Sequence, residues 1–127
     1  MTGYVGNIEK ETLANEFFRQ VVFTGSHSQL VLMSLNPSEE IGMEVHANVD
    51  QFFRIESGEA EAILNGEKHT VGDGDAIFVP AGTNHNIVNT SAVNKLKLYT
   101  IYSPANHKDG TIHKTKAEAE ADESDHV

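Results

Sequence analysis

Four side chains near the middle of the sequence have the types and spacing of a metal site. Glu44 and His46 stand two residues apart, Gln51 follows shortly after, and His85 lies in a second block further along the chain. Alternate residues of a strand face the same side, so we expect Glu44 and His46 to point together. A turn over residues 47–50 would return the chain with Gln51 on that face. Two imidazoles, a carboxylate and an amide oxygen suit a divalent first-row transition metal (Fe, Mn, Ni or Zn), with one or two positions left for water or substrate.

The composition limits the alternatives. The chain has 127 residues, no cysteine and a formal net charge of −10. This length predicts one domain with a sizeable core, and any metal must be held without thiolates. The negative charge argues against nucleic acid or an anionic membrane as a partner. No apolar run approaches the roughly 18 residues of a membrane span, and the first residues lack the basic and apolar regions of a secretion signal. We therefore expect a cytoplasmic protein.

Short apolar segments, broken by Gly, Pro, Asn or Ser, predict that strands position the four ligands. The predicted strands are Phe18–Thr24, Gln29–Leu35, Gly42–His46, Gln51–Glu56, Ala60–Leu64, Lys68–Val71, Ala76–Val79, His85–Asn89 and Leu96–Tyr102. Asn65-Gly66 is the clearest turn signal, because both residues accept the positive φ of a type I′ hairpin. Short strands at this spacing, with no helix between them, are typical of an antiparallel sandwich or small barrel, so the predicted fold class is all-β.

The predicted barrel spans residues 17–103 and follows a polar N-terminal arm, residues 1–16. Within this arm, Asn7 can cap a short helix over residues 8–15. The arm is therefore expected to be helical or irregular.

The acidic C-terminal tail, residues 104–127, is the second arm. Thr115 and Glu118 form a plausible capping box, and residues 116–123 are rich in helix formers. A helix here would have almost no apolar face. The sequence leaves open whether it lies on the barrel, crosses to a partner or stays solvated.

The second block resembles the second motif of the cupin superfamily, G-x5-P-x-G-x2-H-x3-N. It matches every fixed position, with Gly74, Pro80, Gly82, His85 and Asn89. The resemblance covers roughly residues 28–102 and implies a jelly-roll barrel, the double-stranded β-helix of cupins. The stretches EVH, DQFFRIE and KLYTIYSP look closest to small single-domain bacterial cupins labelled mannose-6-phosphate isomerase-like. That label reflects a shared fold and is weak evidence for a reaction.

The first block resembles the first cupin motif, G-x5-H-x-H-x3,4-E-x6-G, less closely. Counting back from Gly58 places Gln51 where the family has Glu, His46 at the second His and Glu44 at the first. Gly42 then lies closer to the ligand pair than the motif asks.

These departures from the first motif change the chemistry of the ligand set. With Glu44 in place of a histidine, the site keeps two imidazoles and regains the negative charge that Gln51 does not provide. Gln51 should bind a metal more weakly than a carboxylate, or act as a hydrogen-bonding neighbour of the ligands. Asp50 is the competing ligand if the turn differs by one residue; the spacing to Gly58 and the strand parity favour Gln51.

Apolar side chains are expected to line the cup around the ligands. Phe53, Ile55 and Ile87 share the parity of the ligands, and Met33 should face the same interior. We interpret these four residues as the substrate pocket, with packing as their main role.

The candidate catalytic residues are Glu44, if it is not bound to the metal, and two tyrosines. Tyr99 and Tyr102 lie on opposite faces of one predicted strand, so at most one can point into the cup as an acid or hydrogen-bond donor. His107 and His113 follow the last predicted strand, and the sequence leaves open a role for them at this site or at a neighbour's.

Three functions fit these observations. The favoured one is a metal-dependent isomerase, lyase or epimerase acting on a small sugar or on a hydroxy or keto acid. The second is an iron-dependent dioxygenase, and the third is a non-catalytic small-molecule-binding cupin. No nucleotide site or phosphate-binding loop is evident, so we expect no nucleotide or organic cofactor, and mannose-6-phosphate itself is not supported.

The resemblance also implies a homodimer, since small cupins commonly add N-terminal strands to a partner's sheet. Four apolar residues, Phe17, Phe18, Val21 and Val22, would be costly to leave on an exposed edge.

Overall fold

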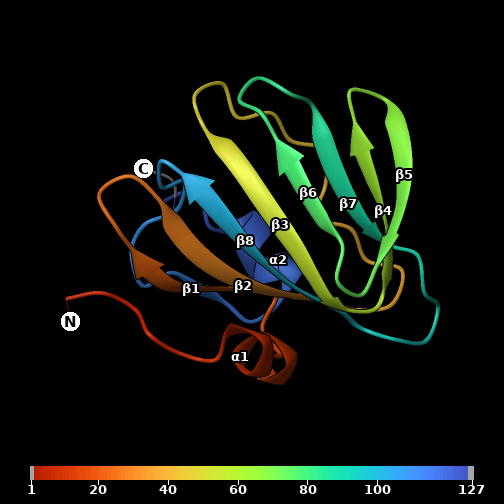
Figure 1. Ribbon diagram of the computed structural model, residues 1–127, viewed down its shortest axis with the longest axis horizontal. Helices are drawn as coiled ribbons and strands as arrows, with labels where there is room; N and C mark the ends of the chain where they lie inside the picture. Colours follow the sequence, from red (N-terminus) through yellow and green to blue (C-terminus); the bar gives the residue numbers. More distant parts are fainter. Residues whose placement is uncertain (1, 126–127) are drawn as a thin grey trace.

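The computed structural model describes residues 2–125, which form two antiparallel sheets that face each other (Figure 1). Met1, His126 and Val127, at the ends of the two predicted arms, lie outside the described residues. The larger sheet has the strand order β6-β3-β8-β2-β1-β9, and the smaller has the order β5-β4-β7. The elements are α1 (Ile8–Ala14), β1 (Arg19–Thr24), β2 (Gln29–Leu35), β3 (Asp50–Ser57), β4 (Glu59–Leu64), β5 (Glu67–Gly72), β6 (Ala76–Val79), β7 (His85–Asn89), β8 (Leu96–Ser103), β9 (Ile112–His113) and α2 (Lys116–Ala121).

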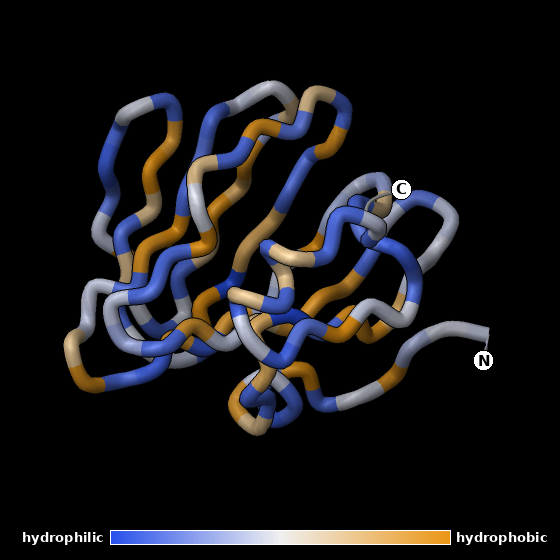
Figure 2. The backbone as a smooth tube through the Cα atoms, turned by 180° about the vertical axis from the view of Figure 1, so that it is seen from behind, coloured by the Kyte–Doolittle hydropathy of each residue, from blue (hydrophilic) through white to orange (hydrophobic). Residues whose placement is uncertain are grey.

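The core lies between the two sheets, and the period-two pattern of the strands produces it. Along β3, the inward residues Gln51, Phe53 and Ile55 are buried, while their neighbours are more exposed. Figure 2 shows hydrophobic and hydrophilic residues following each other at short intervals along the chain, and in β4 the alternate residues Ala60 and Ala62 are buried. Ile87 from β7 and Leu98 from β8 are both fully buried and belong to the same core cluster. The predicted all-β jelly-roll class is confirmed.

The hairpin between β4 and β5 forms where the local sequence predicts it. Asn65 and Gly66 have φ angles of +48° and +85°, as a type I′ turn requires. The register pairs Leu64 with Glu67 and continues to Glu59 and Gly72.

The predicted strand over residues 42–46 is wrong as a regular strand. Two isolated bridges, Glu40 with Val88 and Glu44 with His85, connect the 40–44 region to β7 without forming a continuous ladder. Gly42 lies between them with a φ of +110°, which interrupts the extended run.

The N-terminal helix follows its predicted cap. The side chain of Asn7 accepts a hydrogen bond from Lys10 N at 3.0 Å, and α1 begins at the next residue. The helix packs against β3 and β8.

The C-terminal helix begins after Thr115, whose hydroxyl accepts from Glu118 N at 3.1 Å. The Glu118 carboxylate accepts from Lys114 N at 2.7 Å, one residue before the position that a capping box predicts. The helix lies on the barrel of its own chain, since Ala119 packs against the core cluster.

Strand β9, which the sequence analysis did not predict, covers the outer edge of β1. Arg19 pairs with His113 and Gln20 with Ile112, and Val21 N donates to Thr111 O at 2.9 Å. Phe18 and Val21, which would be costly to leave exposed, are 3% and 7% exposed within this chain, so they need no partner's sheet to cover them. The homodimer itself stays a prediction.

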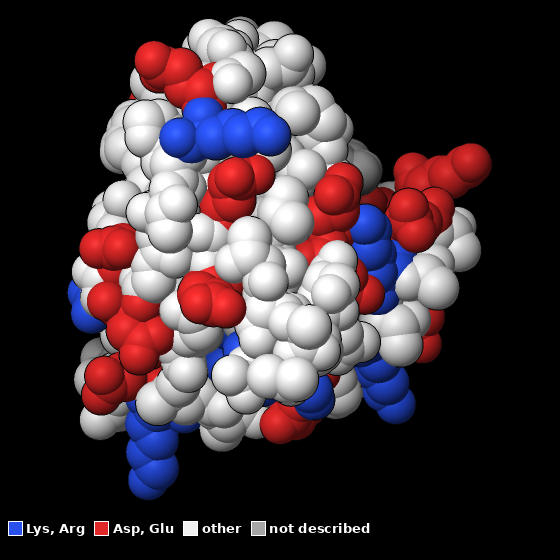
Figure 3. Space-filling view, turned by 90° about the vertical axis from the view of Figure 1, so that its right-hand side faces the viewer, with Lys and Arg blue, Asp and Glu red and all other residues white. Residues whose placement is uncertain are grey.

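Acidic side chains are spread over the face at the right of Figure 1, as the net charge leads one to expect (Figure 3). Of the helices in residues 2–125, none is long and apolar enough to cross a membrane.

Candidate metal centre

Three of the four predicted ligands converge at the junction between the 42–49 segment and the start of β7. Glu44, His46 and His85 each place one potential ligand atom within 4.8 Å of the others. The backbones of Glu44 and His85 exchange two hydrogen bonds of 2.9 Å, which fix one ligand against another. Met43 and Val45 are more than half exposed, and the alternate residues Glu44 and His46 turn inward, as strand alternation predicts.

The histidine nitrogens in this group are arranged to receive a cation. His85 Nδ1 lies 3.0 Å from Thr83 O. A carbonyl can only accept, so Nδ1 carries the hydrogen and Nε2 keeps its lone pair for the site. His46 Nε2 is 3.0 Å from Glu44 Oε2, yet this buried nitrogen has no well-directed hydrogen bond within the described residues. The two atoms lie close together without a well-directed hydrogen bond, an arrangement that fits two ligands of one cation.

Glu44 supplies the negative charge. Burial opposes its ionisation, but the contact with His46 and the nearby charge of Arg19 lower its pKa below the ordinary value. The carboxylate is therefore ionised at neutral pH, as a metal ligand must be.

Gln51, the fourth predicted ligand, faces the interior and is 2% exposed. Its Nε2 donates to Thr100 Oγ1 at 3.0 Å, whereas its buried Oε1 has no hydrogen-bond partner in the described part of the chain. The amide oxygen is thus the free end of this side chain. Asp50, the competing candidate, is exposed and accepts from Ala81 N at 2.8 Å, a bond that holds the 80–82 turn.

Of the two candidate tyrosines, Tyr102 is the inward one. It is 2% exposed, and its ring centroid lies 6.1 Å from that of His46. Burial raises the pKa of the Tyr102 phenol, so this hydroxyl stays protonated and can donate. Tyr99 lies on the other face of β8, with its ring 6.4 Å from that of Phe52.

The four predicted pocket residues are core residues. Met33, Phe53, Ile55 and Ile87 are each at most 1% exposed, and only a repacked core would expose them to a ligand. The ring of Phe53 lies 6.2 Å from that of His85, so this part of the core packs against the candidate metal ligand His85.

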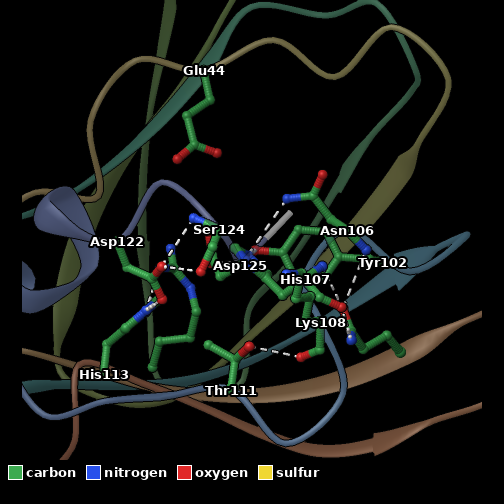
Figure 4. A network of polar contacts seen from close by, with 12 residues as sticks. Glu44, Tyr102, Asn106, His107, Lys108, Thr111, His113, Asp122, Ser124 and Asp125 are labelled. Carbon is green, nitrogen blue, oxygen red and sulfur yellow. Dashed lines mark hydrogen bonds and ion pairs between the residues drawn. The ribbon is translucent and has the colours of Figure 1, made fainter. Parts of the chain in front are cut away.

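A cavity of about 330 Å³ lies beside the ligand group, and the sequence analysis did not predict its outer wall. Its barrel side includes Arg19 and Glu44, and its other side is the C-terminal tail from Lys116 to Asp125. In Figure 4, the Glu44 carboxylate extends toward the tail residues Asp122 and Ser124.

Two histidine–aspartate contacts hold the tail in this position. His107 Nδ1 lies 2.6 Å from Asp125 Oδ2, and His113 Nε2 lies 3.0 Å from Asp122 Oδ2 (Figure 4). His107 Nε2 also lies 3.2 Å from the Tyr102 hydroxyl, which connects the tail to the inner face of the barrel. Sequence patterns did not predict these two contacts, because they join residues that lie outside the two ligand blocks.

Comparison with known proteins agrees with this architecture. The cupin domain family matches residues 31–102, so the chain belongs to that family. An uncharacterized Bacillus subtilis protein, YrkC, is 48% identical over 126 residues, covering 94% of this chain and 67% of that protein. The crystal structure of BH2720 from Bacillus halodurans superposes with a TM-score of 0.91 at 44% identity, covering 94% of each chain. A weaker match, 29% identical over 84 residues, is to the quercetin 2,3-dioxygenase of B. subtilis, and covers 66% of this chain but 25% of that enzyme.

Proposed function

We propose that this protein is a metal-dependent enzyme of the isomerase, lyase or epimerase type, acting on a small sugar or on a hydroxy or keto acid. The observation that carries the proposal is the convergence of Glu44, His46 and His85 beside a cavity of about 330 Å³. A cavity of this size suits a small metabolite.

The ligand set has the composition that divalent first-row metals accept. Two imidazoles and one carboxylate would hold the ion, and the unpartnered amide oxygen of Gln51 is the candidate for a fourth, weaker contact. A divalent ion held by these residues would act as a Lewis acid toward a substrate carbonyl and would make the adjacent C–H bond more acidic.

The protein's own groups complete this chemistry. Tyr102 keeps its proton, and to donate to a substrate oxygen its hydroxyl would have to leave its 3.2 Å contact with His107 Nε2. Glu44 lines the cavity as an ionised carboxylate, so it is the group that can take up a proton if it does not bind the metal. The tail forms the outer wall of the cavity and would shield a bound substrate from water on that side.

A second candidate function is an iron-dependent dioxygenase. The match to quercetin 2,3-dioxygenase supports it, and two histidines with a carboxylate are the ligands that non-haem iron oxygenases use. Both functions require the same metal centre, and they differ in the metal and in the consumption of O2.

The first experiment is elemental analysis of protein purified without chelators or a metal-affinity tag. We expect about one first-row metal ion per chain in the wild type and its loss in His85→Ala and Glu44→Ala. His69→Ala is the matched control, because His69 is an exposed histidine on β5 and should keep the metal. A metal content that is the same in all four proteins would show that the ion binds elsewhere.

The reaction class is tested on the metal-loaded protein in deuterated water with a panel of small sugars and hydroxy and keto acids. Exchange of the hydrogen next to the carbonyl, followed by NMR, would support isomerase or lyase chemistry. Bound iron with O2 uptake and no exchange would favour the dioxygenase. Ligand binding without either reaction would leave a non-catalytic binder.

We also propose a cytoplasmic homodimer that needs no nucleotide or organic cofactor and binds neither nucleic acid nor membrane. Size-exclusion chromatography with light scattering tests the oligomeric state, and a monodisperse monomer would contradict the dimer.

A further inference from the structure

Arg19 is a buried cation that faces the cavity. It is the first residue of β1 and shares the inward parity of Val21, so its side chain enters the interior and is only 6% exposed. The guanidinium carbon lies 5.2 Å from the centroid of the Phe18 ring, and one terminal nitrogen lies 3.2 Å from His113 Nδ1. Its Nε is buried and has no hydrogen-bond partner among residues 2–125.

The neighbours of Arg19 do not neutralise it. The guanidinium can only donate, so His113 Nδ1 must accept, and the hydrogen of this neutral imidazole sits on Nε2, facing Asp122. Within the described residues, no carboxylate oxygen comes within 4.0 Å of the Arg19 nitrogens. A buried charge that no carboxylate contacts directly is costly, which marks this guanidinium as a place for an anion.

The acidic residues of the tail do not serve as that anion. Asp122 is hydrogen-bonded to His113 and Ser124, and Asp125 contacts His107. Glu120 and Glu123 also line the cavity but are exposed to solvent.

Arg19 and Glu44 line the same cavity from its barrel side. The guanidinium therefore faces the cavity that lies beside the cluster of Glu44, His46 and His85. A metal bound to Glu44 would neutralise its negative charge, and the positive charge of Arg19 would then attract a further anion.

We propose that Arg19 binds the carboxylate of the substrate, while the substrate's neighbouring oxygen lies toward Glu44, His46 and His85. The planar guanidinium matches a carboxylate through paired N–H donors, and a neutral sugar offers no such partner. This inference rests on the proposed function and narrows its substrate class to small 2-hydroxy or 2-oxo acids.

The test is calorimetric titration of the zinc-loaded protein with glycolate, and with its neutral analogue glycolamide, in chloride-matched buffer. We expect glycolate to bind the wild type, and to bind Arg19→Met at least about tenfold more weakly, as loss of a charge-assisted bond predicts. Glycolamide should bind the two proteins alike. Arg54→Met is the matched control, because Arg54 is a partly exposed arginine that pairs with Glu56, and it should bind glycolate as the wild type does.

Equal glycolate affinity in the wild type and Arg19→Met, or no glycolate binding by the wild type, would overturn the inference. If Arg19→Met does not fold, as judged by circular dichroism, Arg19→Lys carries the test, since a lysine keeps the charge but loses the paired donors and should still weaken glycolate. If the protein binds no metal, the proposed function fails on its own. The same titration of the metal-free protein must then show Arg19-dependent glycolate binding for the inference to stand.

Discussion

Asn89 matches the last position of the second motif, and the structure gives it a structural role rather than a chemical one. Its side-chain amide donates to the carbonyls of Leu35, Asn36 and Asn94 at 3.3, 3.0 and 2.9 Å, and its Oδ1 accepts from Ser91 N at 3.0 Å. The side chain is 1% exposed. It therefore joins the end of β2, the end of β7 and the loop before β8 inside the protein.

The substitution Asn89→Ala removes all of these contacts and leaves buried polar groups unpaired. At about 0.5–1.5 kcal/mol for each net hydrogen bond, the four contacts predict a loss of about 2–6 kcal/mol in the free energy of unfolding. For a chain of this size, the melting temperature should fall by roughly 8–24 °C. Asn89→Asp should be at least as harmful, because its carboxylate would face three carbonyl oxygens.

Urea denaturation followed by circular dichroism measures the loss, with Asn48→Ala as the control. Asn48 is exposed, and its truncation should change stability by less than about 0.5 kcal/mol. Metal content measured on folded Asn89→Ala should match that of the wild type, because Asn89 lies at the opposite end of β7 from His85. A stability loss below about 1 kcal/mol, or loss of metal from folded protein, would refute this reasoning.

Three further predictions concern a turn, the tail and the fourth ligand. Gly58→Ala should lower the free energy of unfolding, measured in urea, by about 1–3 kcal/mol, because φ is +118° and the new Cβ would lie 3.1 Å from a backbone carbonyl. Gly66→Ala, where φ is +85° and the space is open, should cost less, and equal losses would show that the close contact at Gly58 has no effect. Hydrogen bonds from His113 and Ser124 lower the pKa of Asp122 in the folded state. Its ionised form therefore stabilises the docked tail above the unfolded pKa of about 4, and that stability is lost as pH falls through the lower folded value; the melting temperature of Asp122→Asn should show a flatter decline in this acid range, and a parallel decline would count against it. Gln51→Glu should tighten metal binding in a competition titration and destabilise the metal-free protein, since it adds a second buried carboxylate; unchanged affinity would mean that this side chain does not reach the metal.

Local signals in the sequence predicted much of the fold for identifiable reasons. The Asn65-Gly66 turn depends on the φ preferences of two adjacent residues, and the two helices begin at the side-chain caps of Asn7 and Thr115. Part of the candidate site could also be predicted from the sequence, because Glu44 and His46 lie in one short segment and strand alternation turns them the same way. The predicted strand around them was wrong because a single glycine with positive φ interrupts it.

The remaining features depend on contacts between distant parts of the chain. Arg19 and His113 are 94 residues apart, and nothing near either one indicates that they meet or that β9 covers β1. The docking of the tail likewise depends on His107 and Asp125, whose pairing is set by the path of the whole chain around the barrel.

The sequence by itself determined the all-β class, the hairpin, the helix starts and a set of metal-binding residue types, since each follows from short-range backbone preferences or residue spacing. The tertiary structure decided which face of β8 turns inward, that the tail forms one wall of the cavity, and that the buried cation Arg19 lines the same cavity as Glu44. These outcomes depend on the folding of two sheets against each other, which brings side chains from opposite ends of the chain into one cavity.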